Sequence, residues 1–146
     1  MSDKTQEQKM RELAELLGHE PGYLSGSHEQ PGPKRTFLNT GRAFLRALAK
    51  DLNLTDSKVS VNPAGIAVSG DCTLIGMWKM NGIYIDISDF CGLNDAILYR
   101  TVRHMKDYAG GQNRYISRSE WGVISYQDLL KCLSALREED THEHVA

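Results

Sequence analysis

The order of hydrophobic patterns along this chain predicts an α+β fold, in which an antiparallel sheet of about five strands forms a meander and helices pack on one face. Two segments with helical periodicity come first, a long stretch of period-two alternation follows, and a third helical segment comes last. Because strands and helices are segregated, a parallel βαβ sheet is not expected. At 146 residues, the chain has the length of one domain that needs no metal or disulfide to hold its core.

The first helix is expected from about Thr5 to Leu17. Thr5 and Gln8 have the spacing of a capping box, and Gly18 is placed to end the helix. At about 100° per residue, a single apolar arc is available for packing, and it comprises Met10, Leu13, Leu16 and Leu17.

Composition divides the chain into four parts. Residues 1–18 form the N-terminal helix, and residues 19–35, which are rich in Gly and Pro, are interpreted as a linker or long loop. Residues 36–140 form the α+β domain, and residues 141–146 form a disordered tail. We therefore expect the domain to fold without the first helix, which is then available to dock on a partner or to join two copies of the chain in a homodimer.

The second helix, from about Thr36 to Asn53, has an apolar side and a basic side. Gly41 weakens the helix and predicts the close approach of another backbone. The apolar side predicts a buried face formed by Phe37, Phe44, Leu45, Leu48 and Leu52. The basic side carries three cations at i, i+4 spacing, which are Arg42, Arg46 and Lys50.

Period-two alternation predicts the sheet. Each strand is expected to pair with the next, and the five lie at 59–61, 66–68, 72–80, 83–88 and 97–104. The dipeptide Asn81-Gly82 is the strongest hairpin signal and, as a two-residue turn, places Trp78 opposite Ile85. The predicted core face, which the fifth strand is expected to continue, carries Leu74, Trp78, Ile83, Ile85, Ile87, Leu98 and Val102.

The last helix is expected to begin after Ser125, whose side chain is placed as the N-cap. Its spacing predicts that it buries Leu129, Leu130, Leu133 and Leu136.

Charge is unevenly distributed along the chain. The net charge of −2 at pH 7 is not that of a general polyanion-binding domain. Residues 98–121 are nevertheless locally basic, with five cations against two acids. No apolar run is long enough to span a membrane, and the N-terminus lacks the apolar core of a secretory signal, so we expect a cytoplasmic protein.

Aromatic side chains interleave with these cations, and the combination suits stacked bases and phosphates as well as the anchors of a protein interface. The alternative is that the rings belong partly to the core and the cations are only solvated. With the helical stripe, the candidate partner-binding residues are Arg100, Arg103, Lys106, Tyr108, Arg114, Tyr115, Arg118, Arg42, Arg46 and Lys50.

One loop suggests an alternative function. Adjacent glycines at Gly110-Gly111 allow backbone N–H groups to approach an anion, although the spacing matches neither a Walker loop nor a dinucleotide fingerprint. A hydrolase or transferase acting on a phosphate-bearing ligand there would use His104 and Asp107 as its acid–base pair. No metal-site spacing or cofactor motif is present, so neither is predicted. Cys72 and Cys132 are interpreted as small core residues.

Two stretches resemble small accessory proteins of bacterial phages and integrative elements. They are VSVNPAGIAVSGD, from Val59 to Asp71, and ILYRTVRHMKDYAGGQNRY, from Ile97 to Tyr115. The resemblance implies a protein that binds a host or defence component, in some cases as an inhibitor, and it assigns no site residues.

The function expected from the sequence is therefore binding without chemistry. The chain is expected to engage a host protein or nucleoprotein complex through its basic-aromatic residues, because a locally basic segment stands in a chain without a catalytic constellation. Direct binding of nucleic acid and the phosphate-ligand enzyme are the two alternatives.

Overall fold

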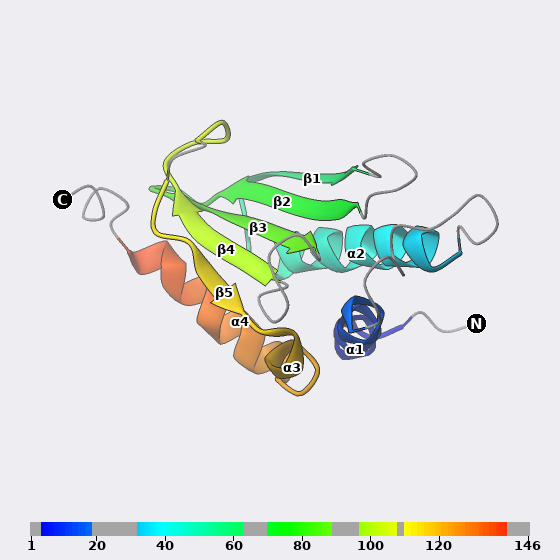
Figure 1. Ribbon diagram of the computed structural model, residues 1–146. Coiled ribbons are helices and arrows are strands. Elements are labelled where there is room, and N and C mark those ends of the chain that lie inside the picture. The colour runs from blue at the N-terminus through cyan, green and yellow to red at the C-terminus, as the bar shows by residue number, and fades with distance from the viewer. Residues whose placement is uncertain (1–3, 19–31, 63–69, 89–96, 108–109, 140–146) are drawn as a thin grey trace.

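The computed structural model of the chain describes residues 4–18, 32–62, 70–88, 97–107 and 110–139. Its antiparallel sheet runs in the order β1-β2-β3-β4-β5, which confirms the predicted α+β class (Figure 1). The strands are β1 (Asp56–Asn62), β2 (Asp71–Met77), β3 (Gly82–Ser88), β4 (Ile97–Val102) and β5 (Arg114–Ile116). The helices are α1 (Gln6–Leu17), α2 (Gly32–Asp51), α3 (Arg118–Trp121), α4 (Tyr126–Ser134) and the short 3₁₀ helix η1 (Ala135–Glu138).

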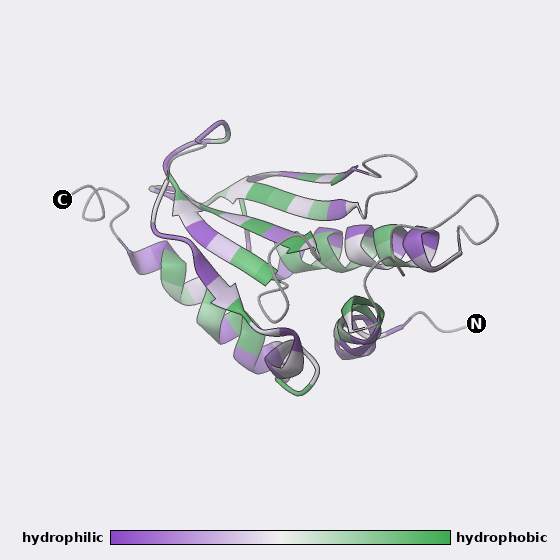
Figure 2. Cartoon of the chain, in the orientation of Figure 1, coloured by the Kyte–Doolittle hydropathy of each residue, from purple (hydrophilic) through white to green (hydrophobic). Residues whose placement is uncertain are grey.

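The helices gather on one face of the sheet. α2 packs against β1 and β2, and α4 runs beside β4 and β5, while α1 packs against both α2 and α3 (Figure 1). Figure 2 shows how hydrophobic and hydrophilic residues alternate along α2 and along the strands, as an element with one buried side requires. Within the part of the chain that the structure describes, no helix is both long enough and apolar enough to cross a bilayer.

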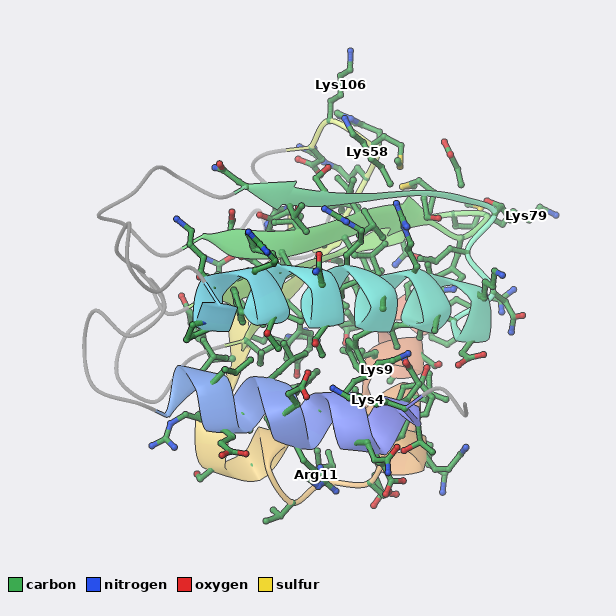
Figure 3. The ribbon with its side chains drawn as sticks, turned by 90° about the vertical axis from the view of Figure 1, so that its right-hand side faces the viewer. Lys4, Lys9, Arg11, Lys58, Lys79 and Lys106 are labelled. Atoms are coloured by element: carbon green, nitrogen blue, oxygen red, sulfur yellow. The ribbon has the colours of Figure 1, made fainter. Side chains whose placement is uncertain are left out.

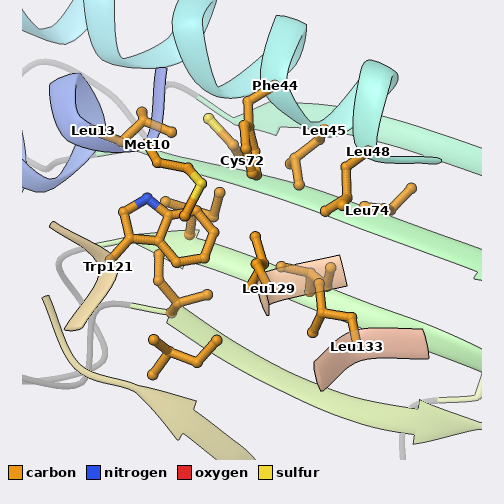
Figure 4. Close-up of a cluster of buried hydrophobic side chains, with 14 of the residues drawn as sticks. Met10, Leu13, Phe44, Leu45, Leu48, Cys72, Leu74, Trp121, Leu129 and Leu133 are labelled. Atoms are coloured by element: carbon orange, nitrogen blue, oxygen red, sulfur yellow. The ribbon is translucent and has the colours of Figure 1, made fainter. Parts of the chain in front are cut away.

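α1 belongs to the same hydrophobic core as the sheet. Met10 and Leu13 are fully buried in one cluster with Phe44 and Trp121 (Figure 4). In addition, Arg11 Nη1 donates a hydrogen bond to the Trp121 carbonyl oxygen at 2.9 Å. The expectation that the first helix stands apart from the domain is therefore corrected, because its apolar arc is used within the chain.

The predicted capping box of α1 is confirmed. Gln8 N donates to Thr5 Oγ1 at 3.1 Å, and Thr5 N donates to Gln8 Oε1 at 2.7 Å. The start of α2 differs from the prediction, since the helix begins at Gly32 rather than at Thr36. Pro33 is compatible with this helix because it lies in the first turn. Backbone N–H groups there have no carbonyl partner within the helix, so the N–H group that proline lacks costs no hydrogen bond. The rest of the predicted linker and the predicted tail lie outside the described residues.

Gly41 lies where α2 packs tightly against β2. A Cβ atom built on Gly41 would lie 2.4 Å from Cys72 Sγ on β2. A close approach is present as predicted, but the neighbour is the Cys72 side chain and not the predicted backbone. The predicted apolar face of this helix is confirmed as well, since all of its members are buried: Phe37, Phe44, Leu45, Leu48 and Leu52.

β1 pairs directly with β2. Val59 lies opposite Leu74, and Val61 lies opposite Cys72. The two neighbours of β2 are thus β1 and β3, so the prediction that residues 66–68 form a strand paired with β2 is wrong; these residues lie outside the described part of the chain.

The β2–β3 hairpin has a longer turn than predicted. Met77 lies opposite Gly82, and Leu74 lies opposite Ile85. Trp78 N donates to Asn81 O at 2.7 Å, which closes a four-residue turn. The predicted two-residue turn is therefore wrong. The predicted core residues of both strands are nevertheless buried, because the register differs from the prediction by an even number of residues, which leaves each side chain on the same face of the sheet.

Asn81 explains why the two-residue turn does not form. Such a turn needs a positive φ at Asn81, but among the described residues Asn53 is the non-glycine residue with a positive φ. The Asn81 side chain is buried instead, and its Nδ2 donates to Leu136 O at 2.8 Å and to Glu139 O at 2.9 Å. The amide thereby satisfies carbonyl groups at the end of η1.

The face assignment of β4 also needs correction. Ile97 and Tyr99 lie opposite Ile87 and Ile85, so they share the helix-covered face. Leu98 and Val102 were expected there, but they belong to the outer face, the side of the sheet opposite the helices. Because β4 carries apolar residues on both faces, alternation alone does not fix its orientation.

The last helix follows the prediction closely. Asp128 N donates to Ser125 Oγ at 3.0 Å, which confirms the N-cap. Leu129 and Leu133 are buried as expected, and Leu136 is buried in η1, while Leu130 is only partly buried. β5 and α3, which precede this helix, were not predicted.

Candidate functional site

Arg100 is an interior residue rather than a surface contact. It lies on the outer face, is 8% exposed, and places its guanidinium 4.8 Å from the centroid of the Tyr84 ring. Its Nη2 donates to Asp107 O at 2.9 Å. The cation–π contact and this hydrogen bond stabilise the loop after β4, so Arg100 is not presented to a partner.

Asp107 organises the same loop. Its carboxylate Oδ2 accepts hydrogen bonds from Arg103 N at 2.8 Å and from Arg103 Nε at 3.2 Å, and the residue is 3% exposed. His104 is exposed, and its Nδ1 accepts a hydrogen bond from Lys106 N at 3.2 Å. The side chains proposed as an acid–base pair are therefore bonded to different groups.

The adjacent glycines serve close packing in this loop. A Cβ atom on Gly110 would lie 2.3 Å from Thr101 O, and one on Gly111 would lie 2.0 Å from Thr101 Oγ1. Gly111 N donates to Thr101 O at 2.9 Å. This geometry accounts for both glycines without a bound anion.

The remaining residues of the predicted basic-aromatic surface are dispersed. Arg114 makes a bidentate pair with Glu139, with N···O distances of 2.8 and 2.6 Å, and these hydrogen bonds raise the pKa of Arg114. Tyr115 is 46% exposed on the outer face. Arg118 is half-buried, and Lys106 is exposed on the loop after β4. Tyr108 lies outside the described residues. Among the described residues of 98–121, Arg100, Arg103 and Arg114 are thus engaged by partners within the chain, and Lys106 and Tyr115 are exposed on different elements.

The stripe on α2 is presented as predicted. Arg46 and Lys50 are exposed, and Arg42 is partly exposed. None of the three takes part in an ion pair or side-chain hydrogen bond within the described part of the chain. The one acid of this helix, Asp51, accepts a hydrogen bond from Tyr126 Oη at 2.6 Å. We call Arg42, Arg46 and Lys50 the α2 basic stripe.

A groove lies between this stripe and the sheet. In Figure 3, α2 faces the viewer, with β1 and β2 above it and α1 below. The groove has a volume of about 440 Å³ and is formed where α2 passes β1. Its apolar part consists of one buried and two half-buried side chains, and the whole lining is Arg46, Ala49, Lys50, Leu54, Ser57 and Val59. We call this the α2–β1 groove.

A second hollow lies on the other side of α2. It has a volume of about 420 Å³ and lies between α1 and α2. Lys4 and Lys9 contribute to it from the side of α1 (Figure 3). Both cations have partners there, because Lys4 pairs with Glu12 and Lys9 Nζ donates to Gln6 Oε1 at 3.1 Å. This hollow therefore offers less unpaired charge than the α2–β1 groove.

The sequence indicated only the basic half of the groove. Its other half comes from β1, where Ser57 and Val59 lie on the helix-covered face. Val59 was predicted to lie in the first strand of the meander, and it is half-buried at the edge of the sheet. The sequence did not predict that α2 passes beside this strand, because alternation specifies the faces of a strand and not the element that covers it.

Asp86 is an ionisable group on the outer face. It lies opposite Thr73 on β2 and Leu98 on β4. Burial, and secondarily the charge of Asp71, raise the pKa of Asp86 from 3.8 to about 7. Within the described part of the chain, its buried Oδ1 has no hydrogen-bond partner. Ionised Asp86 is therefore destabilising in the folded chain.

We expect Asp86→Asn to stabilise the protein at pH 8. Because the pKa of Asp86 is higher in the folded than in the unfolded chain, the unfolded chain loses this proton first, and stability falls as the pH rises from about 4 to about 7. The free energy of unfolding falls by at most about 4 kcal/mol over this range. Asp86→Asn abolishes this fall because the amide does not ionise. Urea unfolding at pH 5 and pH 8 measures the effect, with exposed Asp56→Asn as the control. An Asp86→Asn protein with the pH dependence of the wild type would contradict this assignment.

The described residues bring no three potential metal-ligating side chains together. They hold two free cysteines: Cys72 is buried as predicted, whereas Cys132 is exposed, with its Sγ 3.7 Å from Tyr99 Oη, so its predicted core position is wrong. Searches for relatives give no family model that matches the chain, and no curated protein or solved structure that is significantly similar to it.

Proposed function

We propose that this chain is a non-enzymatic binding protein that contacts a protein partner through the α2 basic stripe. The observation that carries the proposal is the position of Arg46 and Lys50. Both cations are exposed and unpaired within the described residues, and both line a groove with apolar side chains. Arginine beside half-buried apolar surface is typical of protein interfaces.

A protein partner is favoured over nucleic acid for two reasons. Among the described residues, no aromatic side chain lines the α2–β1 groove, whereas binding of single-stranded nucleic acid relies on base stacking against aromatic rings. The chain also has a net charge of −2, which disfavours association with an extended polyanion. The resemblance to accessory proteins of phages and integrative elements agrees with partner binding, and a role as an inhibitor rests on that resemblance alone.

The phosphate-ligand enzyme receives less support. His104 and Asp107 direct their side chains to different hydrogen-bond partners, and neither lines the two hollows described above. Direct binding of nucleic acid through the α2 basic stripe remains the second candidate, because three cations in a row, without an ion pair to any described residue, suit a phosphate backbone.

A pull-down from bacterial lysate, with and without nuclease, tests the proposal. The triple variant Arg42→Ala/Arg46→Ala/Lys50→Ala is expected to capture at least tenfold less protein than the wild type. Nuclease treatment is expected to leave the amount of captured protein unchanged. The matched control is Lys79→Ala/Lys131→Ala/Arg137→Ala, which removes three exposed cations from other elements. Equal capture by the two triple variants would disprove the role of the stripe. Recovery of nucleic acid alone by the wild type would favour the second candidate.

A further inference from the structure

β1 is the longer of the two edge strands that the described part of the sheet has. Among the described strands it pairs with β2 only, whereas the other edge of the sheet is formed by β5. β1 extends over 7 residues and β5 over 3 residues. Natural sheets commonly keep edge strands short, because a long edge presents unpaired N–H and C=O groups to other chains. β1 is therefore a template on which a further strand can pair.

The α2–β1 groove runs beside this edge. α2 lies nearly along the direction of β1 in both views of the molecule (Figures 1 and 3). Ser57 and Val59, two residues apart on β1, line the groove from the sheet, and Arg46 and Lys50 line it from the helix. A strand added at the edge of β1 would therefore lie along α2 and present every second side chain to it.

The spacing of the two cations fits such a strand. Arg46 and Lys50 are one i, i+4 step apart, which corresponds to about 6 Å along a helix. Side chains two residues apart on an extended strand are about 6.8 Å apart on the same face. Acidic residues at alternate positions would thus meet Arg46 and Lys50 in turn.

We propose that the α2–β1 groove binds an extended acidic segment of a protein partner, which pairs as an additional strand with the edge of β1 that faces away from β2. This inference rests on the proposed function and names the chemistry of the partner. Glu fits the groove better than Asp, because its longer stem lies over Val59 and Leu54 while its carboxylate reaches the cations. Main-chain hydrogen bonds to β1 then supply affinity, and the alternating acids supply specificity.

An end-capped octapeptide of alternating Thr and Glu is the probe for this site. We expect it to bind the full chain at low salt, and an octapeptide of alternating Thr and Lys to bind at least tenfold more weakly. Hydrogen exchange reports the binding mode, since only the outward-facing amides of β1 are expected to gain protection. Peptide binding without protection in β1 would overturn strand addition. Absence of binding at about 1 mM peptide would overturn the whole inference, because that concentration detects even an affinity of about −4 kcal/mol.

Methylation of the peptide backbone gives an independent readout. In an added strand, the N–H groups of alternate residues point toward β1, so all Glu amides share one side and all Thr amides share the other. N-methylation of one of the two residue types is expected to abolish binding, and methylation of the other is expected to change it less than threefold. Equal effects of the two modifications would overturn strand pairing.

The cations are tested with Arg46→Gln/Lys50→Gln. We expect at least tenfold weaker peptide binding, while Lys79→Gln/Arg137→Gln, which removes two exposed cations from other elements, is expected to bind like the wild type. Tighter binding of a single-stranded oligonucleotide than of the Thr-Glu peptide would favour a nucleic-acid partner and overturn the inference.

Failure of this inference is distinguishable from failure of the proposed function. Arg42 belongs to the α2 basic stripe but does not line the groove. If the Thr-Glu peptide does not bind while the triple stripe variant still captures less protein than the wild type, strand addition is disproved and the proposed function is supported.

Discussion

Deletion of residues 1–18 is expected to abolish cooperative unfolding of the chain. The side chains of Met10 and Leu13 are fully buried, and truncating each to Ala alone costs roughly 2–5 kcal/mol. The deletion also uncovers Phe44 and Trp121, whose rings pack edge-to-face with centroids 5.3 Å apart. Because domains of this size have stabilities of only about 5–15 kcal/mol, the combined loss is comparable with the whole stability.

Urea unfolding, followed by far-UV and near-UV circular dichroism, measures the effect of this deletion. Leu13→Ala provides an intermediate case, with an expected cost of about 2–5 kcal/mol. Glu15→Ala, at an exposed position of the same helix, is the control and is expected to cost less than about 0.5 kcal/mol. A deleted chain with a sharp transition and retained near-UV signal would contradict the assignment of α1 to the core.

Features determined by neighbouring residues were predictable from the sequence. The caps at Thr5 and Ser125 are local hydrogen bonds between residues three apart, and both form as expected. The buried side of α2 follows from helical periodicity, which predicted Phe44 and Leu48 correctly. Such elements need no knowledge of where the rest of the chain lies.

Features determined by distant residues were not predictable in this way. Asn81 does not adopt the expected turn geometry because its side-chain amide donates a hydrogen bond to the carbonyl group of Leu136, which is 55 residues away in the sequence. The free energy gained from the preferred two-residue turn is smaller than the free-energy cost of leaving buried carbonyl groups without a hydrogen bond. The contact with η1 therefore determines the register of the β2–β3 hairpin. The orientation of β4 is a similar case, because the loop after it packs on the outer face through Arg100 and Asp107.

The candidate site was predictable in the helix but not in the segment 98–121. Cations at i, i+4 positions of α2 lie on one side of any helix, so the α2 basic stripe follows from spacing alone. Three cations of 98–121, which are Arg100, Arg103 and Arg114, have acidic or carbonyl partners whose positions depend on the fold. Arg114, for example, pairs with Glu139, which is 25 residues away. A count of charges along the sequence does not distinguish such internally paired cations from those available to a partner.

Trp78→Ala is expected to destabilise the protein by roughly 3–5 kcal/mol, through the cavity that it leaves. Trp78 is 3% exposed, and its Nε1 donates a hydrogen bond to Leu52 O at 2.7 Å. The side chain thus joins the β2–β3 turn to the residue after α2. Lys79→Ala is the matched control in the same turn, and because this residue is exposed, its cost is expected to be below about 0.5 kcal/mol. Urea unfolding at one pH measures both variants.

Trp78→Phe separates the two contributions of the indole. Phe retains much of the buried apolar area but has no donor for the Leu52 carbonyl group, so a loss of about 1–3 kcal/mol is expected. If Trp78→Phe instead costs as much as Trp78→Ala, the hydrogen bond to Leu52 holds the turn against the end of α2, and packing contributes little. If Trp78→Ala costs no more than Lys79→Ala, the turn is not anchored by this side chain. The even register shift keeps Trp78 on the helix-covered side in both the predicted and the observed hairpin, so the hydrogen bond to Leu52 is the feature specific to the observed turn.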